Sequence, residues 1–117
     1  MKKYTFNIPI YHGYLIVFVT NKIKKLMSKY DVQTLDGTND WGAGVFTRHN
    51  KKGQTEYILA IRKDHLTMQT IAHESLHIAY KILNDRDIVT EISNEEVVCY
   101  LLGWVAKQLD KIKQKNK

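Results

Sequence analysis

Alternating apolar and polar residues near the start of the chain predict a β-hairpin. Residues 4–8 alternate as a half-buried strand does, and Pro9 ends that strand or limits it to a sheet edge. Residues 14–19 form a run of β-branched and aromatic side chains that is typical of a buried strand. Gly13 lies between the two segments, where a tight turn needs a glycine. We therefore expect the two strands to pair.

The spacing of apolar residues then becomes helical. Ile23, Leu26, Met27 and Tyr30 recur at the intervals of one helix face, and Thr20 or Asn21 can cap the start of that helix. The residues that follow, 31–40, are rich in Asp, Gly, Thr and Asn, which predicts a loop.

Two further strands are expected after this loop, at residues 41–47 and 56–62, joined by a polar turn over 48–53. The later strand leads directly into the next helix. Its open edge could therefore accept an extended peptide as an additional strand, although every small sheet has such an edge.

Two longer helices are expected in the second half of the chain. The first begins at Thr67, with Asp64 as a competing cap. The second runs over residues 94–112, with Ser93 as its cap. Each has an apolar face: Ile71, Leu76, Ala79, Ile82 and Leu83 with Ala72 and Ile78 beside them in the first, and Val98, Leu101, Leu102, Val105, Leu109 and Ile112 in the second. The order of elements predicts an α+β fold with three helices and a small, four-stranded, mainly antiparallel sheet, in the order ββαββαα.

The composition is that of a small globular domain. The chain has 117 residues, of which 44% are hydrophobic and 26% charged, enough for one modest core. No apolar run reaches the roughly 18 residues that a membrane-spanning helix needs. We expect a single domain over residues 1–106, followed by a lysine-rich helix end or tail at 107–117.

The positive charge is concentrated at the C-terminus. The formal net charge is +6, and residues 107–117 contribute +4 of it through five lysines against Asp110. Because a short tail carries most of the excess, nucleic acid is not the expected partner. The chain has one cysteine, Cys99, which cannot form an internal disulfide, so a reducing cytoplasm is the expected compartment.

A candidate metal site lies inside the first long helix. His73 and His77 are four residues apart, so on a helix both imidazoles project from one face and can share one metal ion. Glu74 is within reach of the remaining coordination site, where it can accept a proton from a metal-activated water. This H-E-x-x-H pattern indicates a zinc-dependent hydrolase, although so short a pattern also occurs among charged residues that simply face water.

A catalytic zinc ion usually has a third protein ligand. The acidic residues downstream of His77 are Asp85, Asp87, Glu91, Glu95 and Glu96. Glu95 and Glu96, in the first turn of the last helix, are the strongest of these. Helical periodicity places Glu95 nearer the apolar stripe, and Ser93 with Glu96 also matches a capping box, which is a purely structural role.

The two motifs together resemble those of the zincin metallopeptidases, in the gluzincin-like branch where H-E-x-x-H is followed by a glutamate ligand on the next helix. Small phage-type H-E-x-x-H proteins are the most similar, because their next helix carries a pattern like the one at residues 95–103, Glu-Glu-Val-Val-Cys-Tyr-Leu-Leu-Gly. The resemblance covers residues 67–106 and implies a minimal zincin-like core. It also implies Zn²⁺ bound by His73, His77 and Glu96, with Glu74 as the general base.

The expected function is therefore that of a small zinc metallopeptidase acting on a peptide or protein. The alternative is a zincin-like binding or assembly protein, phage-encoded as the resemblance suggests, whose metal is structural or absent. Its basis is size, because few residues remain outside the core to build substrate pockets. A third class, nucleic-acid binding through the basic tail, predicts steep salt dependence that is lost with residues 107–117.

Overall fold

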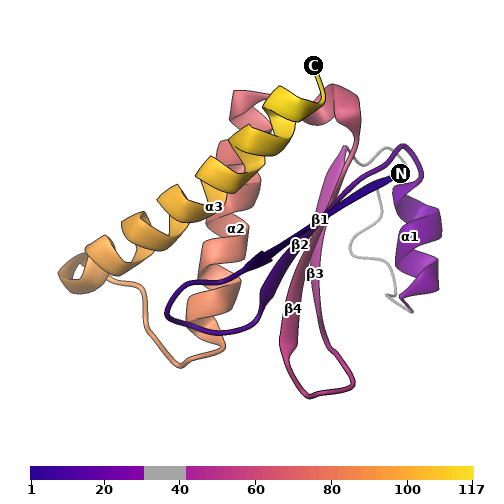
Figure 1. The fold of residues 1–117 in the computed structure, drawn as a ribbon. Helices are drawn as coiled ribbons and strands as arrows, with labels where there is room; N and C mark the ends of the chain where they lie inside the picture. The colour runs from indigo at the N-terminus through magenta and orange to yellow at the C-terminus, as the bar shows by residue number, and fades with distance from the viewer. Residues whose placement is uncertain (31–41) are drawn as a thin grey trace. The chain divides into compact units, whose positions relative to one another are not determined.

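A computed structural model describes residues 1–30 and 42–117 of the chain. In this described part, the fold is α+β, with four strands and three helices in the order ββαββαα, as predicted (Figure 1). The described residues form two compact units, Met1–Leu66 and Thr67–Lys117. The prediction of one domain over residues 1–106 stays a prediction. The predicted loop at 31–40 and the predicted strand start at Trp41 lie outside the described residues.

The first unit contains the sheet. Its strands are β1 (Lys2–Asn7), β2 (Tyr14–Val19), β3 (Ala43–His49) and β4 (Thr55–Ile61). Among the described residues they lie in the order β1-β2-β4-β3. The predicted hairpin forms, with β1 antiparallel to β2, and β3 is antiparallel to β4. The central pair, β2 with β4, is parallel, so the sheet is mixed and mostly antiparallel.

This strand order corrects one expectation about the sheet. β4, the strand that leads into the motif helix, is paired on both sides, by β2 and by β3. Its backbone groups are therefore already used, and it cannot accept a peptide as an additional strand. The sheet edges are β1 and β3.

Helix α1 (Ile23–Lys29) covers part of one face of the sheet. Ile23, Leu26 and Met27 are buried in a cluster with side chains of the three strands β2, β3 and β4, namely Ile16, Phe18, Phe46, Ile58 and Ala60. The helix begins after Lys22, which makes no side-chain cap. The Thr20 hydroxyl instead accepts a hydrogen bond at 3.0 Å from the backbone N–H of Lys22, the residue directly before the helix.

The opposite face of the sheet is a continuous apolar surface. Leu15 and Val17 of β2 and Tyr57, Leu59 and Ile61 of β4 each have 0% of their surface exposed. Alternate residues of two neighbouring strands therefore supply both faces with apolar side chains, as is usual where a parallel pair lies in the middle of a sheet.

The second unit is a pair of long helices, α2 (Met68–Asn84) and α3 (Glu95–Lys115). The two helices pack against each other. Thr67 is the N-cap of α2, as predicted, and its hydroxyl accepts a hydrogen bond from the Thr70 backbone N–H at 3.2 Å. Among the described residues, no helix is both long and apolar enough to cross a membrane.

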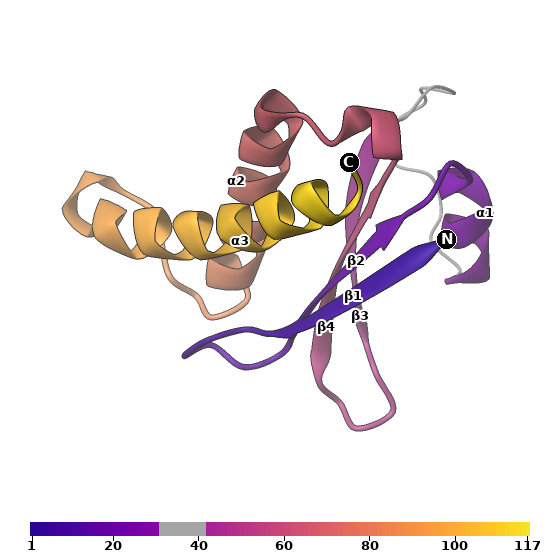
Figure 2. The ribbon, with the colours of Figure 1, turned by 45° about the horizontal axis from the view of Figure 1, so that its top comes forward.

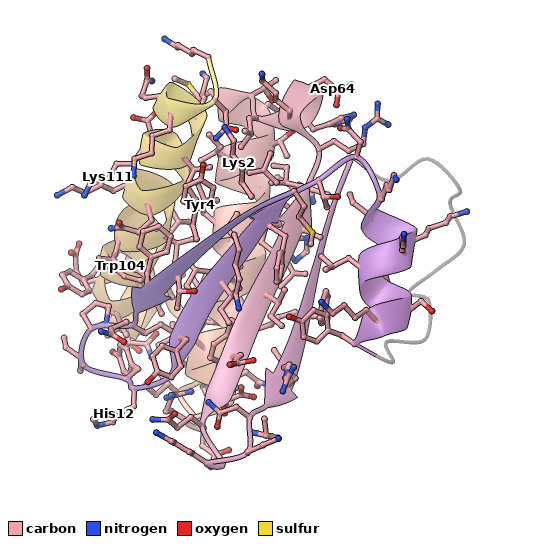
Figure 3. All side chains as sticks on the ribbon, turned by 45° about the vertical axis from the view of Figure 1, so that its right-hand side comes forward. Lys2, Tyr4, His12, Asp64, Trp104 and Lys111 are labelled. Atoms are coloured by element: carbon pink, nitrogen blue, oxygen red, sulfur yellow. The ribbon has the colours of Figure 1, made fainter. Side chains whose placement is uncertain are left out.

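The start of α3 differs from the prediction. A short 3₁₀ turn, η2 (Ile92–Asn94), precedes it, and Asn94 rather than Ser93 is the N-cap residue. Glu91 and Asn94 form a capping box at the start of η2. Helix α3 itself has no side-chain hydrogen bond at its N-cap, so the expected capping box of Ser93 with Glu96 does not form. At its other end α3 extends to Lys115, with Ile112 and Asn116 buried, and Lys111 points outward from it (Figure 3).

Gly42 packs closely against the segment that follows β4. A Cβ atom at Gly42 would lie 2.0 Å from Nδ1 of His65, whereas one at Gly44 would meet nothing within 4 Å. The Gly42 carbonyl also accepts a hydrogen bond from the Arg62 N–H at 2.8 Å, which holds the two segments together. Gly42 is therefore required for close packing.

We expect Gly42→Ala to destabilise the protein by about 1–3 kcal/mol, because the new methyl group forces the His65 ring aside. Chemical denaturation measures this change, with Gly44→Ala as the matched control that should leave stability nearly unaltered. Equal unfolding free energies for the two variants would contradict the close packing of Gly42 against the His65 ring.

Candidate metal centre

Helix α2 brings the two motif histidines together. The Nε2 atoms of His73 and His77 are 3.2 Å apart, and the rings stand at 72° to each other with centroids 4.8 Å apart. Both side chains are exposed. The i, i+4 spacing on a regular helix is sufficient to produce this arrangement, because it stacks the two residues one turn apart.

The separation of these nitrogen atoms fits a shared zinc ion. With zinc–nitrogen bonds of about 2.0–2.1 Å and tetrahedral angles, the two coordinating nitrogen atoms lie about 3.3 Å from each other. The observed 3.2 Å between the Nε2 atoms is close to that value. The two nitrogen atoms are therefore spaced as a shared ion requires, and the same contact also serves as a hydrogen bond between the two rings.

Glu74 differs from the histidines in its environment. The sequence pattern places it beside His73 and His77 on one exposed face, but its side chain is buried, with 8% exposed. The reason is its position three residues after Ile71 and four before Ile78, which puts it at the border of the buried face of α2. Burial raises the pKa of the Glu74 carboxyl above its usual value, and the nearby His73 and His77 partly offset that rise.

The buried face of α2 differs in part from the predicted one. Ile71, Ile78, Ala79, Ile82 and Leu83 are buried as expected. Leu76 is 36% exposed and Ala72 is also exposed, so these two were wrongly assigned to the apolar face. Glu74 and Ser75, which were not expected on this face, are buried there.

The described residues contain no group of three or more His, Cys, Asp or Glu side chains that could hold a metal ion. Glu95 and Glu96 are exposed in the first turn of α3. The buried residues of α3 start only at Leu101, about 7.5 Å further along the axis than Glu96 at 1.5 Å per residue. Glu96 as the third ligand, in preference to Glu95, therefore stays a prediction.

The shape of the helix pair explains why neither glutamate joins the histidines. In two views, the first turns of α3 (orange) extend beyond α2, and the middle of α3 crosses it (Figures 1 and 2). The buried side chains of α3 belong to its later turns, namely Leu101, Val105, Gln108, Leu109 and Ile112.

The remaining histidines belong to the other unit, Met1–Leu66. His12 is exposed in the connection between β1 and β2 and points outward (Figure 3). His49 is exposed at the end of β3, where its Nδ1 atom lies 3.3 Å from the Thr55 hydroxyl. His65 is half-buried against Gly42.

Ser75 is a feature of α2 that the sequence pattern did not single out. Its side chain is fully buried, and the hydroxyl oxygen has no hydrogen-bond partner within the described structure. A hydroxyl that is removed from water without a partner costs free energy. The sequence signal for this buried hydroxyl is that the residues four positions before and after Ser75, Ile71 and Ala79, are both apolar and lie on its side of the helix.

We expect Ser75→Ala to leave stability unchanged or to raise it by about 1 kcal/mol, because the unpaired hydroxyl is removed and little volume is lost. The matched control is Ala79→Ser, one turn later, which adds a hydroxyl at an equally buried position and should destabilise the protein by about 1–3 kcal/mol. Thermal unfolding of both variants checks this. A marked loss of stability in Ser75→Ala would reveal a hydrogen bond that the structure lacks.

Comparison of the chain with protein-family models, with curated proteins and with solved structures gives no significant match. The function is therefore argued from the residues themselves.

Proposed function

We propose that this chain is a small zinc-dependent hydrolase that cleaves peptide bonds, with His73 and His77 as metal ligands and Glu74 as the general base. The observation that carries the proposal is the 3.2 Å separation of the two Nε2 atoms on a helix that also buries Glu74 beside them. The resemblance of the two sequence motifs to those of zincin metallopeptidases supports the same chemistry.

Each side chain has a defined task in this proposal. His73 and His77 present neutral Nε2 atoms to the ion, and Glu96 supplies the third ligand. A bound Zn²⁺ would polarise the scissile carbonyl and acidify a water molecule. Glu74 takes the proton from the attacking water and passes it to the leaving amine, and its partly desolvated carboxylate is suited to that exchange.

The expected compartment is a reducing cytoplasm. Cys99, the cysteine of the chain, is an exposed free thiol on α3. A thiol in this position is compatible with such a compartment, where disulfides are rare.

Zinc binding is the first property to measure. We expect one zinc ion per chain, and we expect His73→Ala and His77→Ala each to weaken binding by more than about 100-fold, because loss of a second-shell partner alone costs 10–100-fold. Titration calorimetry measures this, with His49→Ala as the control that removes an exposed imidazole elsewhere.

The same titration decides the third ligand. Glu96→Gln should weaken zinc binding as the histidine variants do, and Glu95→Gln should not. Undiminished affinity in both histidine variants would rule out the metal centre on α2.

Catalysis is tested separately through Glu74. We expect Glu74→Gln to retain zinc but to lower the cleavage rate of unstructured peptides by about 10²–10⁴-fold, because the general base is lost. Asp110→Asn, which removes an exposed carboxylate of α3, is the control and should keep full activity. Full activity in Glu74→Gln would contradict the role of this residue.

A second candidate function is a zincin-like binding or assembly protein whose metal is structural or absent. The exposed position of Glu96 and the lack of a three-residue metal group in the described part of the chain favour it. Stoichiometric zinc without peptide cleavage, or no zinc at all, would support this candidate over the hydrolase.

A further inference from the structure

The face of the sheet that packs against α1 is only partly covered. Phe18, Phe46, Ile58 and Ala60 lie in the cluster that α1 buries. Tyr14, which is the next residue of β2 on the same face as Ile16 and Phe18, is only partly buried. The part of this face beyond the α1 cluster therefore forms a surface of its own, within the unit Met1–Leu66.

This surface is a hollow with a volume of about 480 Å³. Its floor is formed by β1, β2 and the pair of β3 and β4, and the turn between β3 and β4 forms one wall. Four cationic side chains line it: Lys3, Arg48, Lys51 and Lys52. The acidic residue in the lining, Glu56, is bound to Arg48 at 3.1 Å, so three lysines remain without a carboxylate among the lining residues. We call this surface the basic hollow.

The cations of the basic hollow are held in place by their neighbours. Arg48 pairs with Glu56 and also lies over the Tyr30 ring, at 5.1 Å from its centroid. Lys3 lies over the Phe18 ring at 5.7 Å. Both side chains therefore lose little additional freedom on binding a ligand, which lowers the cost of association.

The turn that carries Lys51 and Lys52 is equally well ordered. The Asn50 carboxamide oxygen accepts hydrogen bonds from the Lys52 and Gln54 backbone N–H groups, at 2.9 and 3.0 Å. Gly53 takes the positive φ of 76° that closes the turn. Both lysine side chains are exposed, so the turn presents two adjacent positive charges at the rim.

We propose that the basic hollow binds an extended acidic peptide segment of another protein. The hollow reaches from β1 to β3 across three strand spacings, about 14 Å, and Lys3 lies four residues, about 13 Å, from the level of Arg48 along the strands. The diagonal from Lys3 to Arg48 is therefore about 19 Å, the length of about six extended residues. Lys3 lies on the β1 side, and Lys51 and Lys52 lie at the β3–β4 turn. A segment with carboxylates at both ends and apolar residues between them matches these charges, with the half-buried Tyr14 beneath its centre.

The lining favours a peptide over single-stranded nucleic acid. Proteins that bind single strands stack successive bases on several aromatic rings. Among the residues that line the basic hollow, Tyr14 is the one aromatic side chain. The Tyr30 ring is engaged by Phe18 and Phe46, with centroids 5.9 and 5.8 Å away, and by Arg48. This inference does not depend on zinc binding by α2.

The test uses the full chain and a fluorescent peptide of about ten residues with two acidic residues on each side of an apolar centre. Fluorescence anisotropy should show saturable binding that weakens at least tenfold in the variant with both Lys51→Glu and Lys52→Glu. The matched control carries Lys22→Glu and Lys25→Glu, which reverse two exposed lysines outside the hollow, and its affinity should stay within about twofold of the parent. Circular dichroism checks that both variants are folded.

Two further probes make the result decisive. A peptide with lysine in place of each acidic residue should not bind, and an oligothymidylate of equal charge should bind more weakly than the acidic peptide. The proposal is overturned by an equal loss in both double variants, by no binding of the acidic peptide, or by tighter binding of the oligothymidylate that depends on Lys51 and Lys52. Weaker binding of a Tyr14→Ala variant would further support contact with the floor of the hollow.

Discussion

The stacking of two imidazoles one helical turn apart is the interaction on which the functional account depends. It requires that α2 be regular from its cap at Thr67 through His77, so that the Nε2 atoms meet at 3.2 Å. The same regular geometry turns the neighbouring Glu74 towards the buried face. One helix therefore presents two exposed imidazole nitrogen atoms and one partly desolvated carboxylate, which are the groups that the proposed hydrolase requires from α2.

The placement of Glu74 between solvent and core has a stability cost. A carboxylate loses hydration when it is buried, and at this position the adjacent imidazoles are the groups that can compensate. Ser75 adds a second unfavourable group, because its buried hydroxyl has no hydrogen-bond partner among the residues that the structure describes. Two polar residues on the otherwise apolar buried face of α2 are difficult to explain by packing alone. Functional sites are where such local violations are expected.

The helices and strands were largely predictable from the sequence, because apolar residues recur in them at regular helical or strand spacing. Residues 14–19 form a strand with the predicted ends, and Thr67 caps α2 as expected. The parallel pairing of β2 with β4 was not predictable in this way, since a strand pattern does not specify which neighbour the strand pairs with. The predicted N-cap of α3 was wrong by one residue, because Ser93 lies inside the 3₁₀ turn η2 that Glu91 and Asn94 cap, and α3 begins only after Asn94. The basic hollow has no signature in the sequence, since its residues are brought together only by the order of the strands. The two histidines were predictable from their spacing, whereas a third ligand depends on how α3 crosses α2, which no local pattern encodes.

The most direct test of the metal centre is X-ray absorption at the zinc edge on the protein loaded with one equivalent of zinc. The account predicts two imidazole nitrogen atoms at about 2.0–2.1 Å, with the rest of the shell made of oxygen atoms at about 2.0–2.2 Å. A sulfur atom at about 2.3 Å would place the ion at Cys99 instead. That result, or a shell without imidazole scattering, would contradict a centre built on His73 and His77.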